Sequence, residues 1–368
     1  MKASIVSALL GAAMVAQAHP GQSHAEMAKE IEERSAYLST HKRSLDHCAD
    51  KLKARGNDAI MHARRSAMVD GLRKKRSIGT DSPYLRARDL DSILATSHET
   101  NLTGITPNTD AATLFAGANA CILSPEVTQG PYYVQGELVR QNIVDGQQGV
   151  DMTMDIQIID VNTCEPVPNV YLEAWHCNST GVYSGVVASS NGDSSDTANL
   201  DTTFLRGIQK SNDDGVVTFD TLFPGHYTSR ATHIHVLTHV NETENTNKTL
   251  ASTGSVTHVG QLFFDQDLIS LVEASDVYNT NTQELTTNAD DSILSEEASD
   301  VDPIMEYVLL GDDVTDGIFA WIAFGMDTSS NYTISPAAYL YADGGVENEN
   351  SQMGGGGGGA APTGAPPS

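Results

Sequence analysis

The strongest constraint on the fold is a series of short segments, after residue 150, in which apolar and polar side chains alternate. Turn-forming clusters such as NGDSSD, NDDG and FPG separate these segments. Alternation with a period of two is typical of strands, and many short strands with frequent turns indicate a sandwich or barrel. The sequence therefore predicts a mainly β fold, an antiparallel β-sandwich, with strands within residues 151–161, 169–177, 215–223, 232–240 and 260–264 and a further buried strand at 318–326.

The regions around these segments differ in composition, which predicts a division of the chain. Residues 25–76 lack proline, are rich in Ala, Lys, Arg and Glu, and repeat apolar residues at helical spacing. The Gly- and Pro-rich end cannot bury enough surface to fold. The predicted organisation is a signal peptide at 1–18, a helical region at 19–79, a connector at 80–117, a β-sandwich domain at 118–345 and a disordered tail at 346–368.

The first 18 residues have the pattern of a secretory signal peptide, with one early lysine, an apolar run and an Ala-Gln-Ala ending. No later segment approaches the run of about 18 apolar residues that a membrane helix needs. We therefore expect a secreted, extracellular glycoprotein that is released rather than anchored. The basic run Lys74–Arg76 marks either a solvated helix end or a cleavage site that removes a pro-segment. Five glycosylation sequons support export, at Asn101, Asn178, Asn241, Asn247 and Asn331.

The four cysteines form an even set in a chain expected to meet an oxidising compartment, and none is spaced as CxxC. Disulfides are therefore favoured over a zinc or redox site, and three pairings are possible. We predict that Cys164 pairs with Cys177, because the two flank one strand connection, and that Cys48 pairs with Cys121.

The charge of the chain is unevenly distributed. The formal net charge is -27, and residues 101–368 contain 5 Lys and Arg against 36 Asp and Glu. Such a field repels nucleic acid and anionic membrane surfaces. It indicates a small neutral or weakly charged partner, and few cations are present to hold a carboxylate.

The segment RATHIH places His233 and His235 on one face of a predicted strand, with Ile234 facing the core. Two imidazoles at this spacing can bind one metal ion, although an ordinary polar strand face carries the same pattern. Two tyrosines strengthen the metal interpretation. Tyr227 ends LFPGHY just upstream, and Tyr183 lies in a Gly-rich turn after Trp175.

These residues carry a resemblance to a known family. The ordered set Tyr, Tyr and His-x-His, with Pro-Gly before the second tyrosine, resembles the intradiol ring-cleavage dioxygenases, among them catechol 1,2-dioxygenases and protocatechuate 3,4-dioxygenases, and especially secreted fungal members. The similarity covers roughly residues 121–265. It includes LSPEVTQGPYY, EAWHCNSTGVYSG, FLRGIQKSNDDGVVTFDTLFPGHY, RATHIHV and GQLFF.

The resemblance implies a non-haem Fe(III) site with Tyr183, Tyr227, His233 and His235 as ligands. Phenolate is a hard anionic donor, so two phenolates and a hydroxide would neutralise a ferric ion. Tyr227 would also accept a substrate proton when the substrate displaces it. The resemblance further implies that Arg230 and Gln261 act beside the iron and that Pro131, Tyr132 and Tyr133 line the substrate pocket. Packing at the start of a strand explains these last three residues equally well. Strict alternation places residue 230 on the opposite face from His233, so a bend or bulge must intervene.

The implied function is an extracellular dioxygenase that uses O2 to cleave a catechol-type ring between its hydroxylated carbons, giving a cis,cis-muconate-type diacid. The partners are then a small aromatic diol and O2. A homodimer is also possible, with the helical region as one element that pairs the subunits. An alternative is a non-enzymatic β-sandwich module that binds phenolics or sugars. A cupin-type His-x-His enzyme is disfavoured because the first glutamate after His235 is Glu242, inside a sequon.

Overall fold

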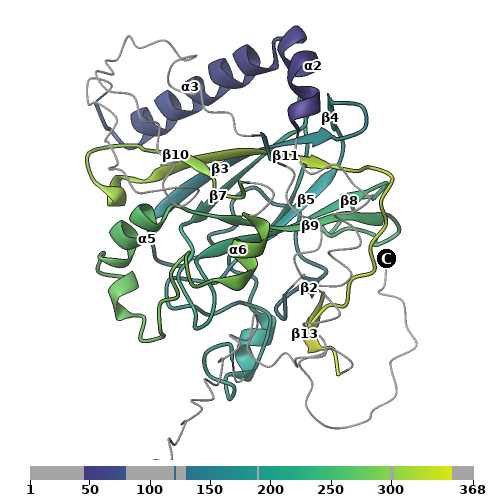
Figure 1. Cartoon of the computed structure of the whole chain (residues 1–368). Coiled ribbons are helices and arrows are strands. Elements are labelled where there is room, and N and C mark those ends of the chain that lie inside the picture. Colours follow the sequence, from purple (N-terminus) through teal and green to yellow (C-terminus); the bar gives the residue numbers. More distant parts are fainter. Residues whose placement is uncertain (1–44, 80–119, 122–129, 189, 299–301, 350–368) are drawn as a thin grey trace, which may run out of the picture.

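The computed structural model describes residues 45–79, 120–121, 130–188, 190–298 and 302–349. The predicted signal peptide, residues 19–44 of the predicted helical region, the whole predicted connector and residues 350–368 of the predicted tail lie outside these ranges. The described chain is mainly β, as predicted, with three sheets (Figure 1). None of its described helices combines the length and apolar character needed to cross a membrane.

The first sheet has β11 and β3 at its centre, and these two long strands run parallel. β10 pairs antiparallel with β11, and β7 and β4 pair antiparallel with β3. The sheet is therefore mixed rather than purely antiparallel. Its strands are β1 (Ala120–Cys121), β3 (Asp151–Asp160), β4 (Glu165–Pro166), β7 (Val216–Leu222), β10 (Glu306–Leu309) and β11 (Ile318–Met326).

The second sheet is antiparallel throughout, in the order β6-β5-β8-β9, and a small third sheet has the order β13-β12-β2. The second sheet comprises β6 (Arg206–Lys210), β5 (Tyr171–Trp175), β8 (His233–Val240) and β9 (Ser255–Phe263). The third comprises β13 (Gly344–Glu347), β12 (Ala338–Tyr341) and β2 (Val134–Gln135). Ordered structure thus extends through Glu347, so the predicted start of the tail at residue 346 is too early.

The main core lies between the first two sheets, and alternation decides which side chains enter it. Even-numbered residues of β3, β8 and β11 belong to this core, for example Ile156, Ile234 and Ile322. The odd-numbered residues therefore project from the outer faces. Ile234 in the core leaves His233 and His235 on the outer face of the second sheet, as the sequence predicted.

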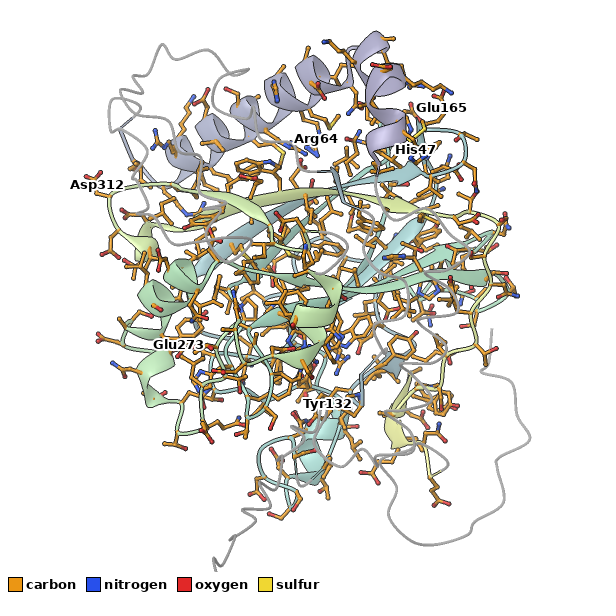
Figure 2. All side chains as sticks on the ribbon, in the orientation of Figure 1. His47, Arg64, Tyr132, Glu165, Glu273 and Asp312 are labelled. Atoms are coloured by element: carbon orange, nitrogen blue, oxygen red, sulfur yellow. A yellow bond between two sulfur atoms is a disulfide. The ribbon has the colours of Figure 1, made fainter. Side chains whose placement is uncertain are left out.

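The outer face of the first sheet is covered by the N-terminal helices α2 (Ala49–Ala54) and α3 (Asn57–Lys75), which lie across it in Figure 1. Val69 of α3 packs with Phe319 and Trp321 of β11. Arg64 and Arg65 reach from α3 to Asp155 on β3, and Figure 2 shows Arg64 between the helix and the sheet. Covering both faces explains why nearly all of β3 is buried.

The remaining helical elements are short. α5 contributes Leu268, Ile269 and Val272 to the main core, and α6 packs near the start of β8 through Ile293 and Leu294. Their bounds are α5 (Gln266–Glu273) and α6 (Ser292–Glu297), with 3-10 helices η1 (Asp46–Cys48), η3 (Thr197–Asp201), η4 (Tyr278–Thr280) and η5 (Val314–Asp316).

The predicted cysteine pairing is wrong. Cys48, just before α2, forms a disulfide with Cys164 in the turn after β3, closing a separation of 116 residues. Cys177 is a free, buried thiol that donates to the carbonyl of Gly225 at 3.3 Å. The side chain of Cys121 lies outside the described residues. Proximity in sequence misled the prediction because the helical region folds back over the β3–β4 turn.

His258 on β9 is buried in the sandwich, with its ring stacked on Phe324 of β11 at 4.9 Å between centroids. Burial lowers its pKa to about 3. Below about pH 6.5 the unfolded chain binds a proton here that the folded chain does not, so folding stability falls as the pH drops. Between these two pKa values, His258 lowers the free energy of unfolding by about 1.4 kcal/mol for each unit by which the pH falls.

We expect the stability advantage of the wild type over His258→Gln to shrink by about this amount per pH unit between pH 6 and 4.5. The difference between the two proteins cancels the titration of all other groups. Urea unfolding of both proteins at several pH values measures it. If the free energies of unfolding of the two proteins change in parallel with pH, His258 titrates normally in the folded protein.

Candidate metal centre

The four predicted ligands come from three segments on the outer face of the second sheet. Tyr183 lies in the loop after β5, Tyr227 in the loop after β7, and the two histidines at the start of β8. All four side chains are buried: Tyr183 and His235 are fully inaccessible, and Tyr227 and His233 are 2% exposed. The structure thus collects residues separated by more than 50 positions into one place.

The donor atoms of these side chains converge. His233 Nε2 lies 3.1 Å from His235 Nε2 and 3.3 Å from the hydroxyl oxygen of Tyr227. The Tyr183 ring lies 5.6 Å from that of Tyr227 and 6.1 Å from that of His235, measured between centroids. Two imidazole nitrogens and the Tyr227 oxygen therefore meet at one buried point, with the Tyr183 ring beside them.

The orientation of His233 is fixed by a backbone carbonyl. Its Nδ1 donates to the oxygen of Ala231 at 2.6 Å, which leaves the lone pair on Nε2 in the neutral ring. Metal-binding histidines are commonly held in this way through their other nitrogen. The Nε2 atom directed at the centre is therefore the one suited to bind a cation.

His235 is positioned by packing. Its ring stacks on that of Trp175, with 4.9 Å between centroids and 5° between planes. On another side Gly130, with φ of +72°, approaches so closely that a Cβ would lie 2.8 Å from His235 Cε1. The strand register explains this contact, because Trp175, His235 and Gln261 form one row across β5, β8 and β9.

The electrostatics of the centre suit a cation. Burial raises the pKa of both Tyr183 and Tyr227, so neither phenol ionises in this site without a compensating positive charge. Burial, together with the Arg230 charge, lowers the pKa of His233, which keeps the ring neutral. The donor set therefore consists of two imidazoles, with His233 held neutral, and of phenols that become anionic beside a hard cation, and this set fits a ferric ion.

Arg230 and Gln261 lie next to the ligands and contact each other. Arg230 Nη2 donates to Gln261 Oε1 at 2.5 Å, and Gln261 lies opposite His235 in the β8–β9 register. The required bend is a tight turn, in which Tyr227 pairs with Arg230 and Ser229 adopts φ of 74°. Because β8 begins only at His233, alternation does not apply to residue 230.

The predicted pocket residues separate into different environments. Tyr132 stacks on Tyr183 at 4.6 Å and donates to the carbonyl of Ser190 at 2.9 Å, so it belongs to the centre. Tyr133 points elsewhere, with its hydroxyl donating to Glu173 at 3.3 Å. Pro131 is half-buried in the same segment.

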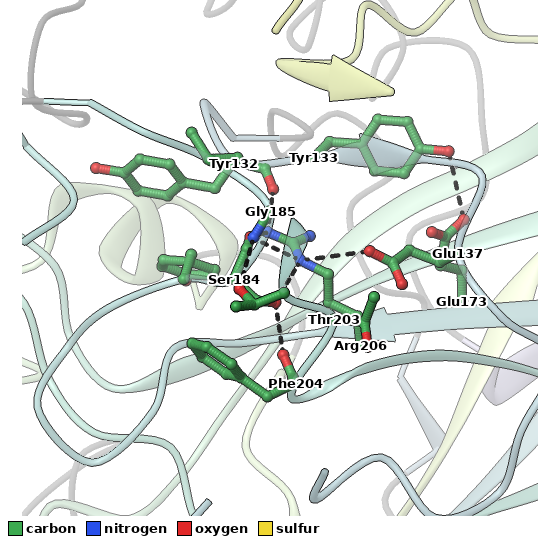
Figure 3. A network of polar contacts seen from close by, with 12 residues as sticks. Tyr132, Tyr133, Glu137, Glu173, Ser184, Gly185, Thr203, Phe204 and Arg206 are labelled. Atoms are coloured by element: carbon green, nitrogen blue, oxygen red, sulfur yellow. Dashed lines mark hydrogen bonds and ion pairs between the residues drawn. The ribbon is translucent and has the colours of Figure 1, made fainter. Parts of the chain in front are cut away.

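A buried polar network supports the loop that carries Tyr183 (Figure 3). Arg206 donates to the backbone carbonyls of Tyr132 and Ser184, both at 2.7 Å, which ties two segments of the site together. Its Nε lies 3.8 Å from Glu137, whose pKa burial raises to about 8. This network was not predicted, because Tyr132, Ser184 and Arg206 are far apart in the sequence and meet only in the fold.

The other histidines have structural partners. His176 bonds to Cys177 and Thr221, His226 to Glu273, and His239 to Glu173. His239 lies on the same face of β8 as His233 and His235, because the β5–β8 register runs without a break from His235 to His239. Its ring is bound to Glu173 rather than directed at the centre.

A family model described as dioxygenase matches residues 122–307. None of the curated proteins matches the chain. An intradiol ring-cleavage dioxygenase from Tetranychus urticae is 29% identical, with 58% of this chain and 98% of that chain covered and a TM-score of 0.47.

Two bacterial structures are more distant. Catechol 1,2-dioxygenase from Pseudomonas arvilla C-1 is 16% identical, covering 57% of this chain and 63% of its own, with a TM-score of 0.34. Hydroxyquinol 1,2-dioxygenase from Pseudomonas putida DLL-E4 is 18% identical, covering 57% and 68%, with a TM-score of 0.33. Because the family model spans half of the chain, this protein belongs to the intradiol ring-cleavage dioxygenases and is an oxidoreductase.

Proposed function

We propose that this protein cleaves catechol-type rings between their two hydroxylated carbons, incorporating O2 to give a cis,cis-muconate-type diacid. The ferric ion would be held by Tyr183, Tyr227, His233 and His235. The observation that supports this most directly is that, in a buried site, His233 Nε2 lies 3.1 Å from His235 Nε2 and 3.3 Å from the Tyr227 hydroxyl. A ferric ion bound there supplies a Lewis acid that favours the deprotonated diol.

Tyr227 is suited to move a proton. Burial raises the pKa of its phenol, so once its oxygen no longer faces a cation it readily takes up a proton. A substrate hydroxyl that binds beside it can therefore lose its proton to the Tyr227 oxygen.

Arg230 is suited to stabilise negative charge that develops on the ring or on oxygen. Its Nε and Nη2 are bonded, whereas its buried Nη1 has no hydrogen-bond partner among the described residues. A fixed cationic donor in a site without bulk water is effective in this role. Gln261 holds the guanidinium from one side, and the Tyr132 ring offers an apolar surface beside Tyr183.

An uncharged catechol or hydroxyquinol is the favoured substrate, rather than a carboxylated ring. Arg230 is paired with Asp291, and Arg206 lies beside Glu137. Three other basic residues follow position 100. Arg140 pairs with Asp145, and Lys248 pairs with Glu244. Lys210 lies over the Tyr171 ring. Each of these cations thus already has a partner, which a substrate carboxylate would have to displace.

We also propose that the protein is secreted. The N-terminal signal pattern and the Cys48–Cys164 disulfide support export to an oxidising compartment. Among the sequons, Asn241, Asn247 and Asn331 are exposed. Asn178 is half-buried, and its amide is engaged with Gln147.

The function is tested on the purified, iron-loaded protein. We expect a broad visible band from tyrosinate-to-iron charge transfer. Anaerobic addition of catechol or hydroxyquinol should shift this band to longer wavelength, and admission of O2 should replace it with the ultraviolet absorption of a muconate-type product. Protocatechuate is expected to react at least tenfold more slowly. A colourless iron-loaded protein that consumes no O2 would instead favour the non-enzymatic binding module.

A further inference from the structure

Asp291 is a buried carboxylate that contacts the metal centre from a distant part of the chain. It lies immediately before α6, and its side chain is fully buried against that of Arg230. Its Oδ2 accepts from Arg230 Nε at 2.9 Å and from the backbone N–H of Ala231 at 2.7 Å. Its Oδ1 accepts from the N–H groups of Ile293 and Leu294 at 2.8 and 2.9 Å.

These bonds continue directly to the residues of the site. Asp291 accepts from the backbone N–H of Ala231, and the carbonyl oxygen of the same residue accepts from His233 Nδ1. The guanidinium of Arg230, whose Nε is bound by Asp291, donates to Gln261. One carboxylate therefore fixes the backbone that orients His233 and the cation that faces the substrate.

We propose that Asp291 is the positioning residue of this centre, acting on metal binding through Ala231 and His233 and on catalysis through Arg230. The inference rests on the proposed function of the site. A carboxylate is required because four N–H donors converge on two oxygens, and a neutral amide offers only one acceptor. Burial alone would raise the pKa of Asp291, but Arg230 and the backbone donors outweigh this effect and lower it, so the group remains charged.

The substitution Asp291→Asn separates the two roles of the side chain. Asparagine is as good an N-cap as aspartate, so its oxygen can still accept from the start of α6. Its amide group would then face Arg230 Nε and the Ala231 N–H, which are both donors. The contacts toward the metal centre are lost while the cap of the helix is retained.

Asp313→Asn is the matched control. Asp313 is also an N-cap, accepting from Thr315 N at 2.9 Å at the start of η5, but it is exposed and belongs to the β10–β11 connection. It therefore tests the same chemical change away from the centre.

Iron affinity is measured by competition with a chelator. It is expected to fall about 10-fold in Asp291→Asn, which is the usual effect of losing a residue that orients a metal ligand. In Asp313→Asn the affinity should stay unchanged. The visible band should also change in position or width. For the iron-loaded enzyme we expect kcat/KM to fall about 100-fold, mainly through kcat.

A second variant covers the case in which Asp291→Asn folds poorly because Arg230 is left unpaired. Adding Asp291→Asn to Arg230→Gln removes both charges. In that background it should still weaken iron binding, while kcat/KM should fall no further than in Arg230→Gln alone, because the two residues act on catalysis together.

The outcomes distinguish the inference from the proposed function. If the wild type binds no iron, the proposed function fails, and the inference fails with it. If the wild type binds iron and cleaves catechol while Asp291→Asn matches it in affinity, spectrum and kcat/KM, only the inference is overturned. A lower melting temperature with unchanged affinity and spectrum overturns it equally, because Asp291 would then only stabilise the fold through its pair with Arg230.

Discussion

Replacement of His235 by glutamine is expected to remove the visible band and to lower ring cleavage at least about 1,000-fold. The loss should exceed the 10- to 100-fold effect that is usual for a residue supporting a metal ligand. His235 Nε2 lies 3.1 Å from His233 Nε2, and the ring is held between Trp175 and Gly130, so no neighbouring side chain can replace it. Glutamine has a similar volume, which limits disturbance of the stack on Trp175.

The control for this experiment is His258→Gln, the same change at another buried histidine. His258 lies on β9 but stacks on Phe324 in the sandwich core, away from the ligands. The visible band of the His258→Gln variant, and its iron content by metal analysis, should equal those of the wild type even though the variant is less stable. Iron binding and cleavage that survive in His235→Gln would mean that the ligand set is wrong.

A large loss of stability is expected when the carboxylate beneath α3 is removed. Asp155 on β3 is completely buried and pairs with Arg64 and with Arg65, whose Nε lies 3.1 Å away. Asp155→Asn removes the carboxylate that is hydrogen-bonded to the buried Arg65 guanidinium, which costs about 3–5 kcal/mol of the free energy of unfolding. Urea unfolding followed by tryptophan fluorescence measures the change, because Arg65 lies over the Trp321 ring.

Asp151→Asn on the same strand is the matched control. Asp151 pairs with Arg76 at 3.1 Å, but its side chain is 60% exposed. Exposed ion pairs contribute about 0–1 kcal/mol to the free energy of unfolding. The Asp151→Asn variant should therefore unfold at nearly the same urea concentration as the wild type. Equal, small losses in both variants would show that the N-terminal helices are not docked on the sheet through Asp155.

The strands could be predicted because their signal is local. Alternation in 151–161 and 232–240 follows from one face of each strand lying in the core, and β3 and β8 occupy these segments. The parallel pairing of β3 with β11 could not be read in the same way. The two strands are far apart in sequence, and pairing leaves no mark on either segment alone.

The same distinction applies to the covalent and polar contacts. The Cys48–Cys164 bond depends on the N-terminal helices folding over the β3–β4 turn, so spacing between cysteines did not reveal it. Gln261 could be proposed only by resemblance, whereas the β8–β9 register places it opposite His235.

By itself, the sequence determined that this chain forms a mainly β domain and that two tyrosines and a His-x-His pair are candidates for one metal centre, because residue type and short-range spacing suffice for both. Only the tertiary structure decided which residues support that centre. Asp291 is 60 residues from Ala231 and carries no motif, and a buried carboxylate becomes recognisable only when folding brings donors to both of its oxygens.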